Sequence, residues 1–340
     1  MRKLWLIAAL LLVASVGSAS AQELPHRDQL SPGQWFQLSP GGETVCGHGA
    51  PYSFYYRENP GQDLLIYFQG GGMCWNEQTC SPTGDKTFDE AINPGDPSDN
   101  PGLFPVGIFD LGSPENPFIN YDMLYVNYCS GDMHTGNNVT GLTYHDVYYE
   151  IKNRGAINAA YALNWAYNNI PIPDSVFVAG CSAGAVGAAF WGADIKAHYP
   201  NQRVTLLGDS GGGWRGIDGA TWNLWGTNYQ GATGSSVNNA QFYVGAARQG
   251  ARIAEYNTAS DETQSFFYYV GFSSVQYSEA LRANLRDISR GAGNFRSYTM
   301  YGDLHCVLPR SEFYTYTMGS DRVRDWVASL AAGEPVNNIS

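Results

Sequence analysis

Basic residues are scarce in this chain, and charge of either sign is low. Only 15% of the 340 residues are charged, and 19 Lys and Arg stand against 31 Asp and Glu, which gives a net charge of −12. The lack of positive charge argues against nucleic acid or an anionic membrane surface as a partner. Since 44% of the residues are hydrophobic, the composition also excludes a disordered or coiled-coil protein.

Long hydrophobic runs are absent after residue 21, so no later segment reaches the length of a membrane span. The first 21 residues have the order of a signal peptide. Arg2 and Lys3 precede an apolar stretch at 4–16, and small residues at 19–21 form a cleavage site. We therefore expect export, secreted or periplasmic, with a mature chain that starts at Gln22 and a net charge of −14 once the two basic residues are removed.

Motifs for zinc are missing as well, because neither C-x-x-C nor H-E-x-x-H occurs. We expect no metal and no cofactor. An even number of cysteines in an exported chain indicates disulfides, although six cysteines allow 15 pairings. The six are Cys46, Cys74, Cys80, Cys129, Cys181 and Cys306.

Short apolar runs alternate with helical patterns along the chain. The alternation predicts an α/β fold of the α/β-hydrolase-like type, with a mostly parallel central sheet between two layers of helices. No repeat or linker divides residues 22–340, so we expect one domain there. The predicted strands are Leu64–Phe68, Met123–Tyr128, Val176–Ala179, Val204–Leu207, Arg252–Tyr256 and Phe295–Tyr301, and the predicted helices are Tyr144–Asn168, Ala183–His198 and a C-terminal one over Val323–Leu330.

The region 211–245 does not follow this alternation and is rich in Gly, Trp, Tyr and Asn. A long irregular segment in a compact domain is usually functional or disordered. Its aromatic residues, among them Trp214, suit either an ordered wall of a substrate pocket or a separate cluster packed beside the main core. The sequence leaves both interpretations open.

The sharpest local signal is Gly180-Cys181-Ser182-Ala183-Gly184, a G-x-S-x-G pattern between a predicted strand and a predicted helix. This context is the one that a nucleophile elbow requires. The tight turn would raise the Ser182 hydroxyl above the sheet, and the flanking glycines would let strand and helix approach closely. The N–H of Ala183, at the helix N-terminus, would stabilise an oxyanion.

A nucleophilic serine needs a base and an orienting acid, which follow it in this architecture in the order acid, then His. His305 is the expected base, because it follows a predicted strand late in the chain. Four histidines precede Ser182, and His198 ends the helix after it. Asp261 and Asp209 both follow predicted strands after the elbow, and order alone favours Asp261 over Asp209 as the acid.

Cysteine positions agree with a contact between Ser182 and His305, because Cys181 and Cys306 are their neighbours in sequence. A Cys181–Cys306 disulfide would hold nucleophile and base together. Cys74–Cys80 would close a local loop, and Cys46–Cys129 follows by elimination. The run Gly70-Gly71-Gly72 after a predicted strand supplies further backbone N–H groups for an oxyanion hole.

Four sequence segments together resemble the pectin acetylesterase/Notum family of serine carboxylesterases. They are Gly70-Gly71-Gly72-Met73-Cys74-Trp75-Asn76 with Cys80, Asn127-Tyr128-Cys129-Ser130-Gly131-Asp132, the G-x-S-x-G pattern, and His305-Cys306. The resemblance implies Ser182 as nucleophile, His305 as base, and Gly71, Gly72 and Ala183 as oxyanion donors. The family's Ala-Tyr-Asp-x-x-Gln segment matches residues 259–264 and implies Asp261 as acid.

The chain departs from the family pattern at four positions. It has Met73 where Trp is usual, Ala185 for a second glycine after the elbow, Gln69 for Glu, and Ser260 for Tyr beside the acid. We expect Met73, Trp75, Asp132 and Trp214 to line the substrate pocket.

The sequence therefore predicts a secreted serine esterase, expected as a monomer, that needs no cofactor. Acetylated polysaccharide as substrate is implied by the resemblance alone. Lipid or polyester esters are an alternative with the same triad, and a catalytically inactive carbohydrate-binding protein is an alternative of another class. Acyl length and the alcohol stay open, because a fold and a triad do not name an ester.

Overall fold

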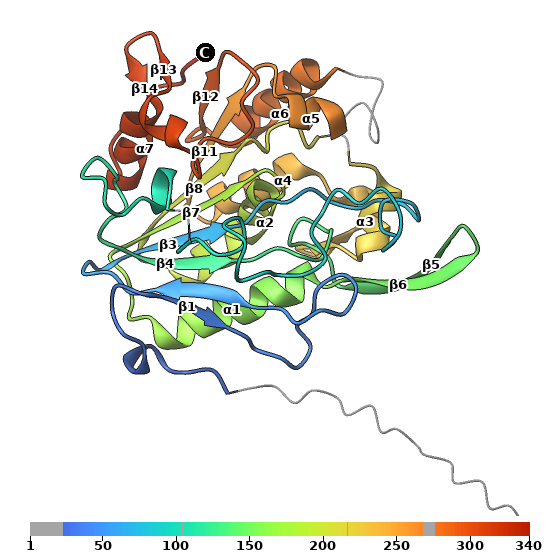
Figure 1. The fold of residues 1–340 in the computed structure, drawn as a ribbon. Coiled ribbons are helices and arrows are strands. Elements are labelled where there is room, and N and C mark those ends of the chain that lie inside the picture. Colours follow the sequence, from blue (N-terminus) through green and yellow to red (C-terminus); the bar gives the residue numbers. More distant parts are fainter. Residues whose placement is uncertain (1–22, 104, 216, 268–275) are drawn as a thin grey trace, which may run out of the picture.

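The computed structural model describes residues 23–103, 105–215, 217–267 and 276–340, so the expected signal peptide at 1–21 lies outside the described residues. An eight-stranded sheet runs through the molecule in the order β1-β2-β4-β3-β7-β8-β11-β12 (Figure 1). Its strands are β1 Trp35–Leu38, β2 Phe54–Arg57, β3 Asp63–Phe68, β4 Tyr121–Val126, β7 Ser175–Cys181, β8 Arg203–Asp209, β11 Arg252–Thr258 and β12 Arg296–Met300.

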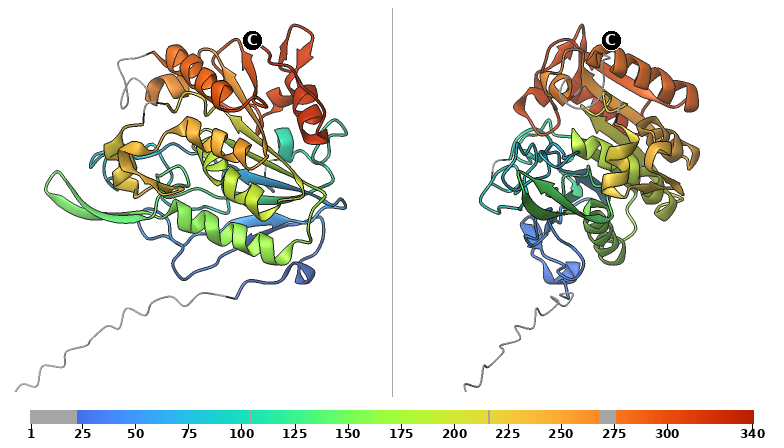
Figure 2. Two further views of the ribbon diagram at one scale, coloured as in Figure 1. Left: turned by 180° about the vertical axis from the view of Figure 1, so that it is seen from behind. Right: turned by 90° about the vertical axis from the view of Figure 1, so that its right-hand side faces the viewer.

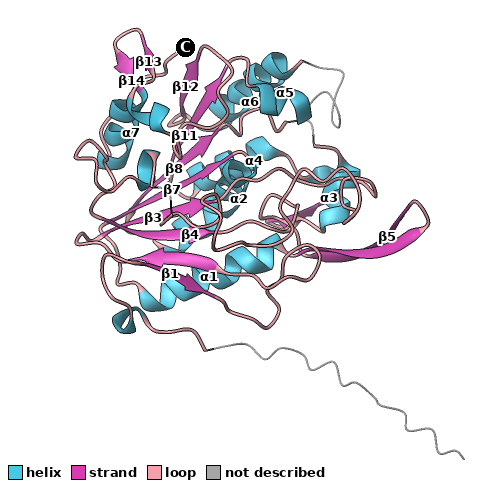
Figure 3. Cartoon of the chain, viewed as in Figure 1, coloured by secondary structure: helices cyan, strands magenta, loops and turns pink. Residues whose placement is uncertain are grey.

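The sheet is parallel from β4 to β12, and only β1 and β2 at one edge pair antiparallel. Helices surround it, as the secondary-structure colouring in Figure 3 shows. They are α1 Gly155–Asn169, α2 Ala183–His198, α3 Gly219–Trp225, α4 Asn239–Arg248, α5 Glu262–Phe267, α6 Tyr277–Gly291 and α7 Val323–Ala332. Three two-stranded ribbons complete the fold: β5 Asn138–Tyr144 with β6 Val147–Asn153, β9 Asn228–Tyr229 with β10 Ala232–Thr233, and β13 Thr317–Met318 with β14 Asp321–Arg322.

Alternate side chains of each strand enter two separate cores, because successive strand residues point to opposite faces. In β3, Leu64 and Ile66 pack with α1, α2 and α4, whereas Leu65 and Tyr67 pack with α7. The two further views in Figure 2 show this layered arrangement from behind and from the side. The predicted mostly parallel α/β sheet covered on both faces is confirmed.

The prediction of one helix over Tyr144–Asn168 is wrong in its first part. Residues 147–153 form strand β6, which pairs with β5 in a ribbon that extends from the body, and α1 begins only at Gly155 (Figure 1). Aromatic and β-branched residues in 147–151 favour a strand. His145 and Asp146 have φ angles of 47° and 61°, which suit the tight turn of a hairpin.

The aromatic region 211–245 is neither a pocket wall nor a separate cluster. It folds into α3, the β9–β10 ribbon and the first part of α4, and its large side chains belong to the larger core. They are Trp214, Trp222, Trp225, Tyr229, Phe242 and Tyr243. Among the described residues, no helix is both long and apolar enough to cross a membrane.

The parallel strands bring four loops to one edge of the sheet. Gly71 follows β3, Ser182 follows β7, Asp261 follows β11 and His305 follows β12. Because the carboxyl ends of parallel strands lie on the same side, residues more than 200 positions apart in sequence meet there. This edge is where the candidate site forms.

Candidate active site

Ser182 occupies a sharp turn between β7 and α2, with φ 57° and ψ −120°. Residues other than glycine rarely adopt this backbone conformation, so contacts with neighbouring residues hold the turn in place. The Ser182 N–H donates to the carbonyl of Asp209 at 2.8 Å. A Cβ on Gly180 would lie 2.2 Å from the carbonyl oxygen of Gly184, and one on Gly184 would lie 2.0 Å from that of Phe68. The two glycines are therefore required by close packing.

His305 lies in the loop after β12, with its ring against the carboxylate of Asp261. His305 Nδ1 is 2.8 Å from Asp261 Oδ2 and 3.0 Å from Oδ1. Asp261 is fully buried and also accepts the backbone N–H and the side-chain amide N–H of Gln264, each at 2.9 Å. An ionised carboxylate is acceptor-only, so it holds the His305 proton on Nδ1.

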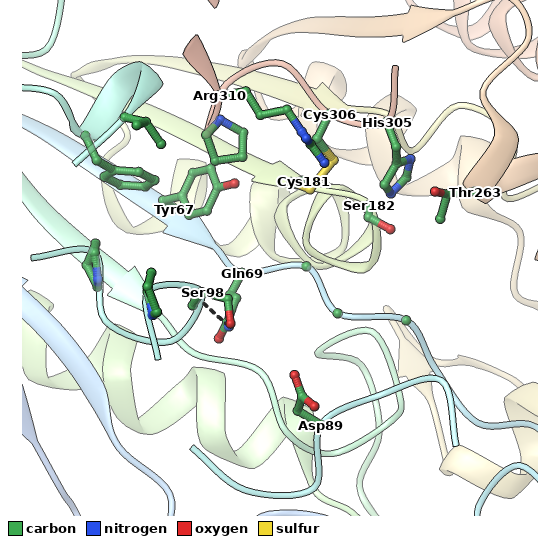
Figure 4. Close-up of a pocket in the computed structure, with 18 of the residues that line it drawn as sticks. Tyr67, Gln69, Asp89, Ser98, Cys181, Ser182, Thr263, His305, Cys306 and Arg310 are labelled. Carbon is green, nitrogen blue, oxygen red and sulfur yellow. Dashed lines mark hydrogen bonds between the residues drawn. A yellow bond between two sulfur atoms is a disulfide. The ribbon is translucent and has the colours of Figure 1, made fainter. Parts of the chain in front are cut away.

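The other ring nitrogen, His305 Nε2, is buried and has no hydrogen-bond partner among the described residues. Ser182 and His305 line the same cavity, and Figure 4 shows their side chains next to each other. A neutral imidazole with a free Nε2 beside a serine hydroxyl can accept its proton. The geometry therefore brings together the three residues expected from the sequence.

The disulfide between Cys181 and Cys306 joins the residues beside Ser182 and His305. Its Cα atoms are 5.6 Å apart, across a sequence separation of 125. The sulfur atoms lie within 4.8 Å of a His305 ring nitrogen, but disulfide sulfurs are not thiolates, so this cluster is not a metal site. The other two disulfides join Cys46 to Cys129 and Cys74 to Cys80, which are also the pairs expected from the sequence.

Gly71 and Gly72 follow β3, which pairs with β7 on the side away from β8, β11 and β12. Both glycines line the cavity. Their φ angles, 140° and 74°, lie in the region that favours glycine, and a Cβ on Gly72 would lie 1.7 Å from the carbonyl oxygen of Thr87. Neither N–H donates to an acceptor within the part of the chain that the structure describes. Ala183 is the first residue of α2, where helix amides have no partner within the helix. All three N–H groups can donate a hydrogen bond to an oxyanion.

The cavity has a volume of about 720 Å³, and Ser182 and His305 are among the residues that line it (Figure 4). Its far wall is aromatic and proline-rich, with Tyr67, Phe109 and Tyr125 among its lining residues. Sequence reasoning did not identify this wall, because it comes from two strands and a loop that are distant in sequence. Thr263 and Phe267 of α5 also line the cavity, and Figure 4 shows Thr263 on the side of Ser182 away from Tyr67.

Three further acidic or basic side chains line the cavity, and the sequence analysis missed them too: Asp89, Arg310 and Glu312. Arg310 is exposed and forms no ion pair with any described residue. Arg310 lies five residues after His305 in the sequence. This closeness to the predicted base is the signal that could have indicated Arg310 as a residue of the cavity.

The four expected pocket residues do not line this cavity, which corrects that prediction. Met73 and Asp132 are fully buried, and the Asp132 carboxylate accepts the Gly155 N–H and the Ser130 hydroxyl, each at 2.7 Å. Trp75 and Trp214 lie one layer behind, where both contact the ring of Phe267. The sequence analysis expected these two residues to line the pocket, but they pack behind Phe267, which does line it.

Asp209, the alternative acid, forms no hydrogen bond with the His305 ring; its carboxylate accepts hydrogen bonds from the backbone beyond it. Its buried carboxylate accepts the backbone N–H groups of Val307 and Leu308 at 2.9 Å and 2.7 Å. Burial raises the pKa of Asp209 to about 6, although those N–H groups and the nearby His305 lower it. In the structure Asp261, and not Asp209, is hydrogen-bonded to the His305 ring.

Comparison with known proteins gives one family and one fold. A model of the pectinacetylesterase family matches residues 39–232, more than half of the chain, which include Gly71, Gly72, Ser182 and Ala183. A search of curated proteins found none that matches. Two crystal forms of the Wnt deacylase Notum from Drosophila align with TM-scores of 0.59 and 0.62. Each is 16% identical, over 87% of this chain and 92% or 93% of the other, a likeness that shows a shared fold.

Proposed function

Because the chain belongs to the pectinacetylesterase family, and is therefore a carboxylesterase-type hydrolase, we propose that it is a secreted, single-domain serine esterase that removes acetyl groups from a polysaccharide. One observation carries the proposal. A strained serine, a half-buried imidazole whose buried Nε2 has no partner among the described residues, and two unpaired glycine amides line one cavity. Three disulfides and the signal peptide expected at 1–21 support export.

In the proposed mechanism Ser182 attacks the ester carbonyl while His305 Nε2 takes its proton. Asp261 keeps the other proton on Nδ1 and stabilises the imidazolium that forms. The amides of Gly71, Gly72 and Ala183 bind the oxyanion of the tetrahedral intermediate. The intermediate expels the alcohol, which takes the proton back from His305, and leaves an acyl-enzyme. Water, deprotonated by the same imidazole, then releases the acid, so no step uses a cofactor.

The alcohol side of the substrate is proposed from the charges of the cavity. Arg310 offers a guanidinium without an ion-pair partner among the described residues, and guanidinium groups pair with carboxylates in a bidentate way. An acidic sugar chain could bind there although the protein carries a large negative charge. Asp89 and Glu312 line the same cavity. Because they are acidic, the cavity as a whole does not attract anions, and a carboxylate of the substrate would bind at Arg310 itself.

The aromatic wall favours a second candidate, an esterase for lipid or polyester substrates. Tyr67, Phe109 and Tyr125, with the surrounding prolines, provide far more apolar lining than an acetyl group needs. An apolar pocket of this volume can bury a longer acyl chain.

The first test measures hydrolysis of p-nitrophenyl esters from acetate to palmitate by the mature protein. We expect the highest kcat/KM on acetate, and a loss on the order of 10⁴-fold or more in kcat for Ser182→Ala and for His305→Ala. His198→Ala is the matched control, because His198 stacks on Tyr167 away from the cavity and should leave kcat unchanged.

Rates that rise with acyl length would move the assignment to lipids or polyesters. Equal activity of the wild type and Ser182→Ala, or none in either, would exclude the triad. It would then favour a secreted carbohydrate-binding protein without turnover.

A further inference from the structure

The loop that carries His305 has little regular structure, yet its three following amides are all held by two neighbouring residues. Cys306 N–H donates to the Ser210 hydroxyl at 2.9 Å. Val307 N–H and Leu308 N–H donate to the Asp209 carboxylate at 2.9 Å and 2.7 Å. Asp209 and Ser210 have no exposed surface. A buried carboxylate thus organises a short run of backbone around the proposed base.

Asp209 also holds the proposed nucleophile, through its main chain. Its carbonyl oxygen accepts the Ser182 N–H at 2.8 Å, and it is the β8 partner of Cys181 in the sheet register. One residue therefore fixes the backbone of Ser182 with its carbonyl and the backbone after His305 with its side chain. The Cys181–Cys306 disulfide joins the same two segments covalently.

We propose that Asp209 is a positioning residue for the reaction, whose carboxylate sets the place of the His305 imidazole relative to Ser182. This inference rests on the proposed serine-esterase function. Hydrogen bonds from Val307, Leu308 and the Ser210 hydroxyl use both carboxylate oxygens. An ionised carboxylate accepts all of them, because it has only acceptors.

An amide of the same shape cannot replace the carboxylate. Val307 N–H donates to both carboxylate oxygens, so whichever of them the NH₂ group of asparagine replaces, this N–H would face a donor and the loop would shift. Displacement of a catalytic group by about 1 Å can cost on the order of 100-fold in rate. The position of His305 should therefore respond to Asp209 although the two side chains form no hydrogen bond with each other.

The test compares Asp209→Asn with Asp303→Asn, a matched control two residues before His305 whose side chain is exposed. For Asp209→Asn we expect kcat to fall roughly 10- to 100-fold while KM changes less than about threefold. Asp303→Asn should retain both constants. Ser210→Ala removes the bond to Cys306 N–H and the hydroxyl's bond to Asp209, but it keeps the carboxylate and its bonds to Val307 and Leu308. It should therefore lower kcat less than Asp209→Asn, and it replaces that variant in the test if Asp209→Asn does not fold.

A second measurement does not depend on turnover. The low-field proton resonance of His305 Nδ1–H, hydrogen-bonded to Asp261, should be present in the wild type and in Asp303→Asn, but lost or shifted in Asp209→Asn. A folded Asp209→Asn with kcat within twofold of the wild type and an unchanged resonance would overturn the positioning role. Inactive wild type would overturn the proposed function instead, and the resonance would still decide whether Asp209 places His305.

Discussion

At the residue scale, the strain at Ser182 is the feature that most separates this site from an ordinary strand-to-helix turn. Its φ of 57° and ψ of −120° fall in a region that glycine tolerates and that costs other residues about 1–3 kcal/mol. Close packing of Gly180 and Gly184, and the hydrogen bond to Asp209, hold the turn in place. The strain is therefore a cost in stability that accompanies the exposure of the hydroxyl to the cavity.

This strain can be measured with two inactive variants. Ser182→Gly removes the Cβ that causes it, whereas Ser182→Ala retains a Cβ. After the larger unfolded-state entropy of glycine is deducted, we expect Ser182→Gly to have a free energy of unfolding about 1 kcal/mol higher than Ser182→Ala. Urea denaturation with intact disulfides measures the difference. A lower stability of the glycine variant would contradict the strain.

At the element scale, the β5–β6 ribbon is anchored at its base and free toward its tip. Tyr149 and Ile151 pack with Phe88 and the Cys74–Cys80 disulfide in a small core of their own. On the other face of the same strand, Tyr148 is 67% exposed and lies across Gly141 of β5. The packing of the ribbon therefore depends on a few side chains near the loop that carries Gly71 and Gly72.

Two alanine substitutions on β6 separate the anchored face from the free one. Ile151→Ala empties a fully buried site and should lower the free energy of unfolding by about 2–4 kcal/mol. Tyr148→Ala should change it by less than about 1 kcal/mol, because the ring is largely in solvent. Chemical denaturation of both variants gives the comparison. Equal losses would mean that the ribbon does not pack as described.

At the scale of the whole molecule, several buried ionisable groups form no ion pair with a described residue. Burial raises the pKa values of Asp132 and Asp209 to about 6 and that of Glu255 to about 7. It lowers the pKa of His134 to about 4. The carboxyls bind protons more tightly in the folded chain than in the unfolded one, so their contribution to stability is full below about pH 4 and is lost as the pH rises through 6 to 7.

His134 acts in the opposite direction, because its stabilising contribution is lost as the pH falls from about 6.5 to 4. The three carboxyls outweigh it, so we expect the melting temperature to be higher at pH 5 than at pH 8. Glu255→Gln, which has no proton to lose, should reduce this difference by roughly 2 to 4 °C. Differential scanning calorimetry at both pH values measures it, with Glu23→Gln as an exposed control. An unchanged difference in Glu255→Gln would contradict the burial effect.

The sequence by itself determined the features that depend on neighbouring residues. Apolar runs alternating with helical patterns gave the α/β class, and the observed strands β3, β4, β7, β8, β11 and β12 overlap the predicted ones. The G-x-S-x-G context indicated Ser182, and chain order indicated His305. These succeed because a tight turn and a buried strand impose local demands on residue type.

Only the tertiary structure decided which distant groups meet. In the folded chain the carboxylate of Asp261 contacts the His305 ring, whereas that of Asp209 accepts backbone N–H groups of the residues after His305. In the structure Trp75 and Trp214 pack behind the cavity against Phe267, whereas Tyr67, Phe109 and Arg310 line it. No local pattern encodes these contacts, because they depend on how strand ends and loops from the whole chain converge on one edge of the sheet.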